Sequence, residues 1–227
     1  MFKLILLLLL LAAAPAFAAS APDDMAQRMQ ACVACHGKEG RATNAGYFPR
    51  IAGKPAGYLY NQLVNFRDGK RHNATMAYLV DQMSDAYLRE IAEYFAGLDL
   101  PYPPPQTTGA APAVLARGEQ LVRHGDAQRG IPACAQCHGA SMTGVNPSMP
   151  GLLGLPRDYV LAQFGAWRSG VRHAAQPDCM GDIARRLAPE DVTAAAVWLS
   201  SQPVPSGPLP AGALPARLPL ACGSGTP

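Results

Sequence analysis

The sequence predicts an all-α protein built from two similar domains that arose by duplication. Shifting the chain by 101 residues aligns a dense set of matching residues, a repeat length typical of a domain rather than of a solenoid unit. Helix-start signals recur in the same order in both halves, and no strand-like alternation of useful length interrupts them. The matched residues are Pro49, Gly53, Pro55, Tyr58, Gln62, Phe66, Arg67, Gly69, Arg71 and His72, and then Pro150, Gly154, Pro156, Tyr159, Gln163, Trp167, Arg168, Gly170, Arg172 and His173.

The first element, residues 1–18, has the pattern of a signal peptide. Lys3 precedes an apolar run, Pro15 interrupts its end, and Ala16-Phe17-Ala18 forms a small-residue cleavage pattern. An uncleaved anchor is the alternative, but the apolar run is much shorter than the ~20 residues that span a bilayer. We expect cleavage near Ala18 and export to the periplasm.

Residues 19–99 form the first predicted domain. Asp23 or Asp24 can cap a helix that leads into the first cysteine pair, and Pro55 opens a second helix that runs through Phe66. Ser84 caps a third helix through Phe95, with Gly97 as its stop.

The rest of the chain repeats this order after a linker. Residues 100–112 are rich in proline, a composition that resists helix formation and spaces domains semi-rigidly. The second predicted domain covers residues 113–202, with helices at 113–123, after Pro156 and from Pro189. Residues 203–227, dense in proline and glycine, form a tail that we expect either to wrap the second domain in an extended conformation or to stay mobile.

A Cys-x-x-Cys-His motif occurs once in each half. The two copies are Cys32, Cys35 and His36, and Cys134, Cys137 and His138. Cysteines three positions apart share one face of a helical turn, where their thiols can reach the two vinyl groups of one porphyrin, and the next histidine can bind the iron. Zinc or redox disulfide chemistry is the alternative. The appended histidine, the repetition and the export signal favour two covalently attached haem c groups.

The sixth iron ligand decides between electron transfer and catalysis. Met76 lies 40 residues after His36, and Met180 lies 42 residues after His138, so each half offers a methionine at a similar place. A thioether favours ferrous iron and raises the reduction potential, as suits an electron carrier. His72 and His173 also recur at matched positions, which leaves bis-histidine ligation as the alternative.

Other side chains near these positions have simpler explanations. A short insertion around Gln176 to Cys179 adds three residues to the offset, so Met83 corresponds to Leu187 in the other half. Met142 and Met149 have no matched methionine, and we expect all three methionines to pack in the core. His124 has no counterpart and is expected on the surface. Four arginines could pair with haem propionates or could simply coat helix ends: Arg67, Arg71, Arg168 and Arg172. Four aromatic residues at helical spacing are expected to line a crevice or the core: Tyr58, Phe66, Tyr159 and Trp167.

Two cysteines remain outside the motifs. In an oxidising compartment we expect Cys179 and Cys222 to form a disulfide, with free thiols or an intermolecular bridge as the alternatives. That bridge would hold the tail beside Met180. Loss of Lys3 with the signal peptide leaves 18 basic and 16 acidic side chains, a balance that does not indicate nucleic-acid binding.

With its two haem motifs, a distal methionine in each half and a repeated Pro-x-x-x-Gly-x-Pro element, the chain resembles the di-haem cytochromes c of the c4 type. The resemblance extends to about Gln202 and implies two class I cytochrome c domains whose haems face one another across a pseudo-twofold interface. It also implies that the segments at Pro49 and Pro150 orient the axial histidines through a hydrogen bond. The extra cysteine pair and the long tail depart from the family pattern.

This resemblance implies an electron-transfer protein rather than an enzyme. The leading hypothesis is a periplasmic shuttle that carries single electrons from a respiratory donor to a terminal oxidase. The alternative is the electron-accepting subunit of a periplasmic dehydrogenase complex, to which the tail could contribute an interface. A di-haem peroxidase is a third hypothesis, which a matched methionine in both halves disfavours. Peripheral association with a membrane is compatible with all three.

Overall fold

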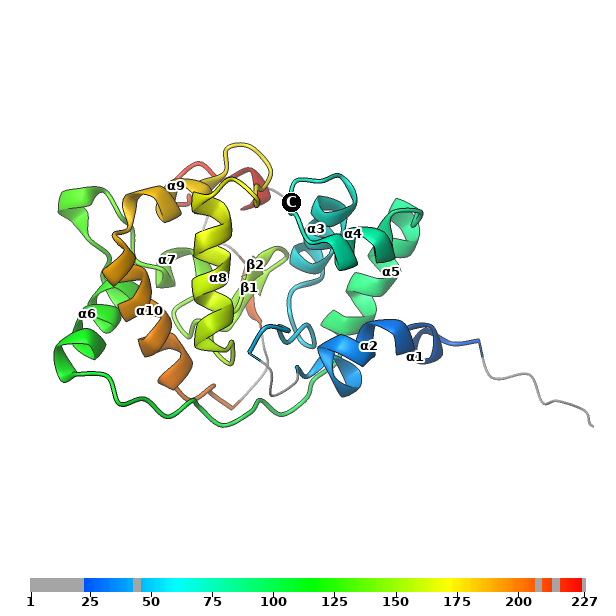
Figure 1. The fold of residues 1–227 in the computed structure, drawn as a ribbon, viewed down its shortest axis with the longest axis horizontal. Helices are drawn as coiled ribbons and strands as arrows, with labels where there is room; N and C mark the ends of the chain where they lie inside the picture. Colours follow the sequence, from blue (N-terminus) through cyan, green and yellow to red (C-terminus); the bar gives the residue numbers. More distant parts are fainter. Residues whose placement is uncertain (1–22, 43–45, 207–209, 214–216, 226–227) are drawn as a thin grey trace, which may run out of the picture.

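The computed structural model describes residues 23–42, 46–206, 210–213 and 217–225, and it consists of two groups of helices that lie side by side (Figure 1). The predicted signal peptide lies outside these residues. Within the described ranges, no helix is both long and apolar enough to cross a membrane.

The first group confirms the predicted helix order. Its helices are α1 (Met25–Arg28), α2 (Gln30–His36), α3 (Ala56–Arg67), α4 (Ala74–Val80) and α5 (Asp85–Ala96). The side chain of Asp24 accepts a hydrogen bond from the Gln27 N–H, and that of Ser84 accepts one from the Tyr87 N–H, so both predicted N-caps are present. The helix that leads into the cysteine pair is interrupted at the buried Met29.

The second group repeats the pattern with α6 (Pro112–Arg123), α7 (Ala135–His138), α8 (Arg157–Arg168), α9 (Cys179–Arg186) and α10 (Pro189–Ser201). Helices α3 and α8 each have 12 residues, and each follows a proline, which supports the duplication. Short 3-10 turns occupy Lys38–Gly40, Ala127–Arg129 and Gly223–Gly225.

A small sheet in the second half was not predicted. Strand β1 (Gly144–Asn146) pairs antiparallel with β2 (Met149–Pro150) and parallel with β3 (Ala211–Ala213), in the order β2-β1-β3. Strands of two or three residues are too short to show an alternating pattern, and β3 comes from the distant tail. The described part of the tail therefore packs against the second half, which agrees with the first of the two expected alternatives.

Each half has its own hydrophobic core. In the first half, α3 and α5 pack together through side chains such as Leu59, Phe66, Leu88 and Phe95. In the second half, α10 packs against α6 and α8, with Leu121, Val122 and Leu199 almost fully buried. The predicted helices thus bury their apolar faces, as amphipathic helices in a small domain must.

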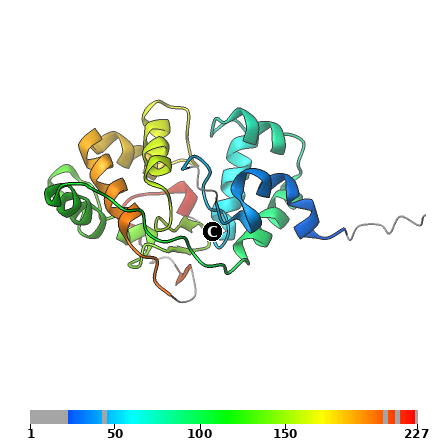
Figure 2. The same ribbon diagram turned by 60° about the horizontal axis from the view of Figure 1, so that its bottom comes forward.

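Backbone hydrogen bonds join the two halves with approximate twofold symmetry. The His72 N–H donates to the Val171 carbonyl at 2.8 Å, the His173 N–H donates to the Lys70 carbonyl at 2.6 Å, and Arg71 and Arg172 form an antiparallel bridge. The segment between α5 and α6 runs along the second half (Figure 2), where the Gln106 N–H donates to the Ser200 carbonyl. This arrangement places the two Cys-x-x-Cys-His motifs around a common interior.

Candidate cofactor site between the two halves

A single cavity of about 860 Å³ lies within and between the two halves. This volume is near the top of the roughly 300–1,000 Å³ typical of cofactor and ligand sites. Its lining includes every residue predicted to hold the cofactors or their iron: Cys32, Cys35, His36, Met76, Cys134, Cys137, His138 and Met180. The fold therefore brings together the residues that the sequence singled out.

Both motif histidines are oriented by a backbone carbonyl. The Nδ1 atom of His36 lies 2.9 Å from the Pro49 carbonyl oxygen, and that of His138 lies 2.8 Å from the Pro150 carbonyl oxygen. Each ring then donates from Nδ1, which fixes the tautomer and leaves Nε2 free to accept a metal bond. The orienting contact expected at Pro49 and Pro150 is therefore present in both halves.

Burial favours the neutral form of both motif histidines and of Cys32, Cys134 and Cys137. It lowers the pKa of His36 and of His138, although their hydrogen bonds to carbonyls act in the opposite direction. Burial also raises the pKa of the Cys134 thiol to about 11. Neutral imidazole is the form that binds a metal. In the described part of the chain, no three His, Cys, Asp or Glu side chains are placed to hold a metal ion by themselves.

The two candidate methionines occupy the first turns of short helices that were not predicted. Asn73 caps α4 by accepting a hydrogen bond from the Met76 N–H at 3.0 Å, and Asp178 caps α9 by accepting one from the Gly181 N–H at 2.9 Å. These caps hold Met76 and Met180 at matching places, where both are half-buried on the cavity wall.

The competing ligands are placed differently. His72 and His173 are exposed at the cavity rim, as expected of residues in a polar loop. Met83 packs against the first core and also reaches the cavity, whereas Met142 is buried in the second core. Buried Met149 also borders the cavity.

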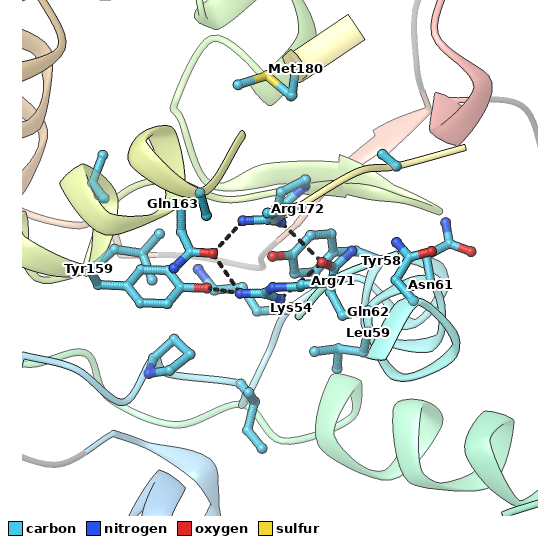
Figure 3. A pocket seen from close by; sticks show the side chains of 18 of the residues that line it. Lys54, Tyr58, Leu59, Asn61, Gln62, Arg71, Tyr159, Gln163, Arg172 and Met180 are labelled. Carbon is cyan, nitrogen blue, oxygen red and sulfur yellow. Dashed lines mark hydrogen bonds between the residues drawn. The ribbon is translucent and has the colours of Figure 1, made fainter. Parts of the chain in front are cut away.

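Two arginines meet at the centre of the interface (Figure 3). Arg71 donates to Gln62 at 3.0 Å and to Gln163 at 2.7 Å, and Arg172 donates to the same glutamines at 3.0 and 2.6 Å. Arg71 also donates to the Tyr159 hydroxyl at 3.0 Å. The two glutamines recur at matched positions in the repeat, a signal that could have linked them to the arginines.

The four arginines singled out in the sequence therefore divide into two pairs. Arg71 and Arg172 line the cavity, where they stack on the rings of Phe66 and Trp167 at 4.5 and 3.8 Å. Arg67 instead pairs with acidic side chains at the surface, and Arg168 donates to a carbonyl at the end of α9. Only the first pair is placed to meet a ligand in the cavity.

The residues of the cavity fit porphyrins that carry carboxylates. Arg71 and Arg172 are only 9% and 6% exposed, yet their hydrogen-bond partners given above are neutral. Buried charges normally require an opposite charge. Trp167 Nε1, also on this wall, is buried and has no hydrogen-bond partner among the described residues. Haem propionates would supply both the counter-charge and the missing acceptor.

The predicted disulfide is present and draws the tail against the second half. Cys179 and Cys222 are bonded, with their Cα atoms 4.9 Å apart. Next to this bond, the Gly223 N–H donates to the Pro177 carbonyl, and Ser148 Oγ donates to the Ser224 carbonyl at 2.7 Å. The tail therefore forms part of the cavity wall beside Met180, and the described residues of the first half contain no comparable segment.

Comparisons with known proteins agree with this geometry. No family model matches the chain. The chain is 40% identical to the thiosulfate dehydrogenase electron acceptor of Thiomonas intermedia strain K12, over 84% of this chain and 85% of that protein. It is 35% identical to cytochrome c4 of Pseudomonas aeruginosa, over 88% of this chain and 98% of that protein. The chain belongs to the di-haem cytochrome c4 family.

Solved structures support the same conclusion. Reduced cytochrome c4 from Pseudomonas stutzeri matches with a TM-score of 0.69 and 28% identity, over 78% of this chain and 95% of that chain. Thiosulfate dehydrogenase TsdBA from Marichromatium purpuratum matches with a TM-score of 0.68 and 30% identity, over 76% of this chain. This chain spans 36% of that longer protein.

Membership of this family confirms several predictions. The fold consists of tandem class I cytochrome c domains, with a small sheet added in the second. The protein carries two covalently bound haem c groups and transfers electrons between redox partners. Its relatives are electron-transfer cytochromes rather than enzymes, which disfavours the peroxidase hypothesis.

Proposed function

We propose that the chain accepts electrons from a dehydrogenase of the thiosulfate dehydrogenase class and passes them singly to another redox protein. The observation that carries this proposal is the 40% identity to a protein named as the electron acceptor of that enzyme. The likeness to TsdBA supports it, because the matching region there forms part of a chain described as thiosulfate dehydrogenase.

The proposed residue roles follow the two halves of the cavity. Cys32 and Cys35 bind one haem through thioether bonds, with His36 and Met76 as its axial ligands. For the second haem, the corresponding residues are Cys134, Cys137, His138 and Met180. The haem iron supplies a site that gains or releases one electron. A histidine and a methionine holding each iron would suit electron transfer rather than the transformation of a substrate.

The buried arginines complete this assignment. Arg71 and Arg172 are proposed to pair with propionates from both haems, since a guanidinium can bind a carboxylate through two parallel hydrogen bonds. One cluster would then serve both cofactors and hold their carboxylates close to each other at the interface.

We propose the periplasm as the compartment, reached after cleavage near Ala18. The disulfide and the covalent haems fit an oxidising compartment. Association with a membrane would arise through a membrane-bound partner. The proposed domains remain 19–99 and 113–202, joined by a linker at 100–112.

A kinetic experiment tests the proposed partner. The exported protein is mixed with a thiosulfate dehydrogenase and thiosulfate, and haem reduction is followed by its visible absorption. We expect reduction to be at least tenfold faster than that of a single-haem cytochrome c of similar potential under the same conditions. Thiosulfate without enzyme is the control and should reduce the protein slowly.

A free respiratory shuttle is the second candidate, favoured by the match to almost the full length of a cytochrome c4 structure. In that case the dehydrogenase would reduce both cytochromes at similar rates. Such a result would reject the proposed partner and leave the electron-transfer role intact.

A further inference from the structure

Lys54 of the first half reaches into the second half. It is only 3% exposed, and its Nζ donates to the Gly151 carbonyl oxygen at 2.9 Å. Gly151 directly follows Pro150, whose carbonyl orients His138. Figure 3 shows Lys54 among the residues that line the same pocket as Arg71 and Arg172. A buried cation of one half thus lies next to the segment that positions the iron-binding histidine of the other.

A second hydrogen bond strengthens this contact between the halves. The Gly57 N–H, in the first turn of α3, donates to the Pro147 carbonyl at 3.0 Å. A Cβ atom at Gly57 would lie 2.7 Å from that carbonyl oxygen, so the close approach requires glycine. The first half therefore holds the 147–151 segment on both sides of Pro150, and the orientation of His138 depends on contacts from outside its own half.

The contact is not symmetric. At the position matched to Lys54 by the 101-residue repeat stands Leu155, which carries no charge. The neighbours of Lys54 Nζ include Arg50, itself a cation, and the ring of Tyr102, whose centroid lies 5.8 Å away. Burial, together with the charge of Arg50, lowers the pKa of Lys54 to about 7, so the side chain is mostly protonated at pH 6. Through Gly151 and its neighbour Pro150, the Lys54 side chain is connected to the carbonyl group that orients His138.

We infer that Lys54 is a positioning residue through which the first half raises the reduction potential of the second haem. A positive charge in a poorly solvated interior disfavours the extra charge of ferric iron. The lysine thereby biases an electron shared by the two haems toward the second one. This inference rests on the proposed role of His138 as an iron ligand.

The test is a redox titration of Lys54→Met in the exported two-haem protein at pH 6, where Lys54 is mostly protonated, followed by NMR of the haem methyl groups, which report on each haem separately. We expect the ferric-to-ferrous ratio of the second haem to rise about tenfold at a fixed applied potential. For a one-electron couple this ratio corresponds to a fall of about 59 mV in the reduction potential of that haem. The first haem should shift much less. Lys70→Met, which removes an exposed lysine of the same half, is the matched control and should change neither haem.

Two further variants separate charge from packing. Lys54→Arg keeps the charge and should leave the reduction potential of the second haem near the wild-type value. Lys54→Gln removes the charge but keeps a hydrogen-bond donor, and it should lower the reduction potential of the second haem. Equal shifts of both haems, no shift of the second, or a fall in Lys54→Arg as large as in Lys54→Met would overturn the inference. Failure of the proposed ligand assignment would look different, because wild-type protein would then lack a second His/Met haem spectrum.

Discussion

Met76 and Met180 show how single residues acquire a role from their local backbone. Each sits in the first turn of a helix whose N-cap is an Asn or Asp side chain, and each faces the cavity. The capped turn limits the positions that the thioether can adopt. Met83 lacks such a cap but also reaches the cavity, so it is the natural control for methionine ligation.

Met76→Ala and Met180→Ala should each remove about half of the weak Met-to-iron charge-transfer absorption at the red end of the oxidised spectrum. The physical reason is loss of one thioether ligand from one haem, which also lowers the potential of that haem. Met83→Leu should leave the band unchanged, since leucine occupies the matched position in the other half. A full band in either alanine variant would exclude that methionine as a ligand.

At the level of elements, an ion-pair network joins two helices of the second half. Arg117 of α6 donates to Asp191 of α10 at 2.7 Å and to Asp126 at 2.9 Å, and Arg129 pairs with both carboxylates. Asp191 is buried, and hydrogen bonds from Arg117 hold its pKa below the usual value. The network links α6, α10 and the turn that precedes the second haem motif.

Asp191→Asn should lower the unfolding free energy of the second half by about 1–2 kcal/mol at pH 7. This loss is smaller than the loss expected for a fully buried ion pair, because both arginines are partly exposed to solvent. The pKa of Asp191 is lower in the folded protein than in the unfolded chain, where it is about 3.8. The carboxylate therefore stabilises the fold at pH values above about 3.8, and this contribution is lost as the pH falls through the lower pKa of the folded state. Denaturant unfolding at pH 7 and pH 3 measures the difference.

Asp182→Asn is the matched control for this experiment. Asp182 pairs with Arg185 on the same face of one helix, and both side chains are largely exposed. We expect a change close to zero at either pH. A loss in Asp191→Asn that persists undiminished at pH 3 would contradict the ion-pair explanation.

On the scale of the whole molecule, the tail makes the two halves unequal. Strand β3 pairs with β1, and the disulfide joins Cys222 to Cys179, the residue before Met180. The first half carries no such cover on the described chain. The second haem is therefore expected to be the better protected of the two.

Replacing both Cys179 and Cys222 with serine should lower the unfolding free energy by about 2–4 kcal/mol, since the bond closes a 43-residue separation. The freed tail should also let added cyanide displace Met180 faster than in the wild type, while binding at the first haem stays unchanged. Thermal unfolding and ligand-binding kinetics measure the two effects. Equal acceleration at both haems would show that the tail does not protect the second site selectively.

The sequence by itself determined the haem motifs, the duplication, the main helices and the candidate methionines. These features depend on residues close together in the chain, such as Cys32, Cys35 and His36 within one helical turn, or on a repeat that direct comparison reveals. The same local information supported the disulfide, because only two cysteines remained outside the motifs.

Only the tertiary structure decided which arginines face the cavity, where the tail lies and which residue of one half touches the other. Lys54 and Gly151 are 97 residues apart, and Arg172 and Gln62 are 110 residues apart. No local pattern encodes such contacts, because they arise from how two folded halves pack against each other. The physical reason is that burial and charge pairing at an interface are properties of the assembled surfaces and not of either segment alone.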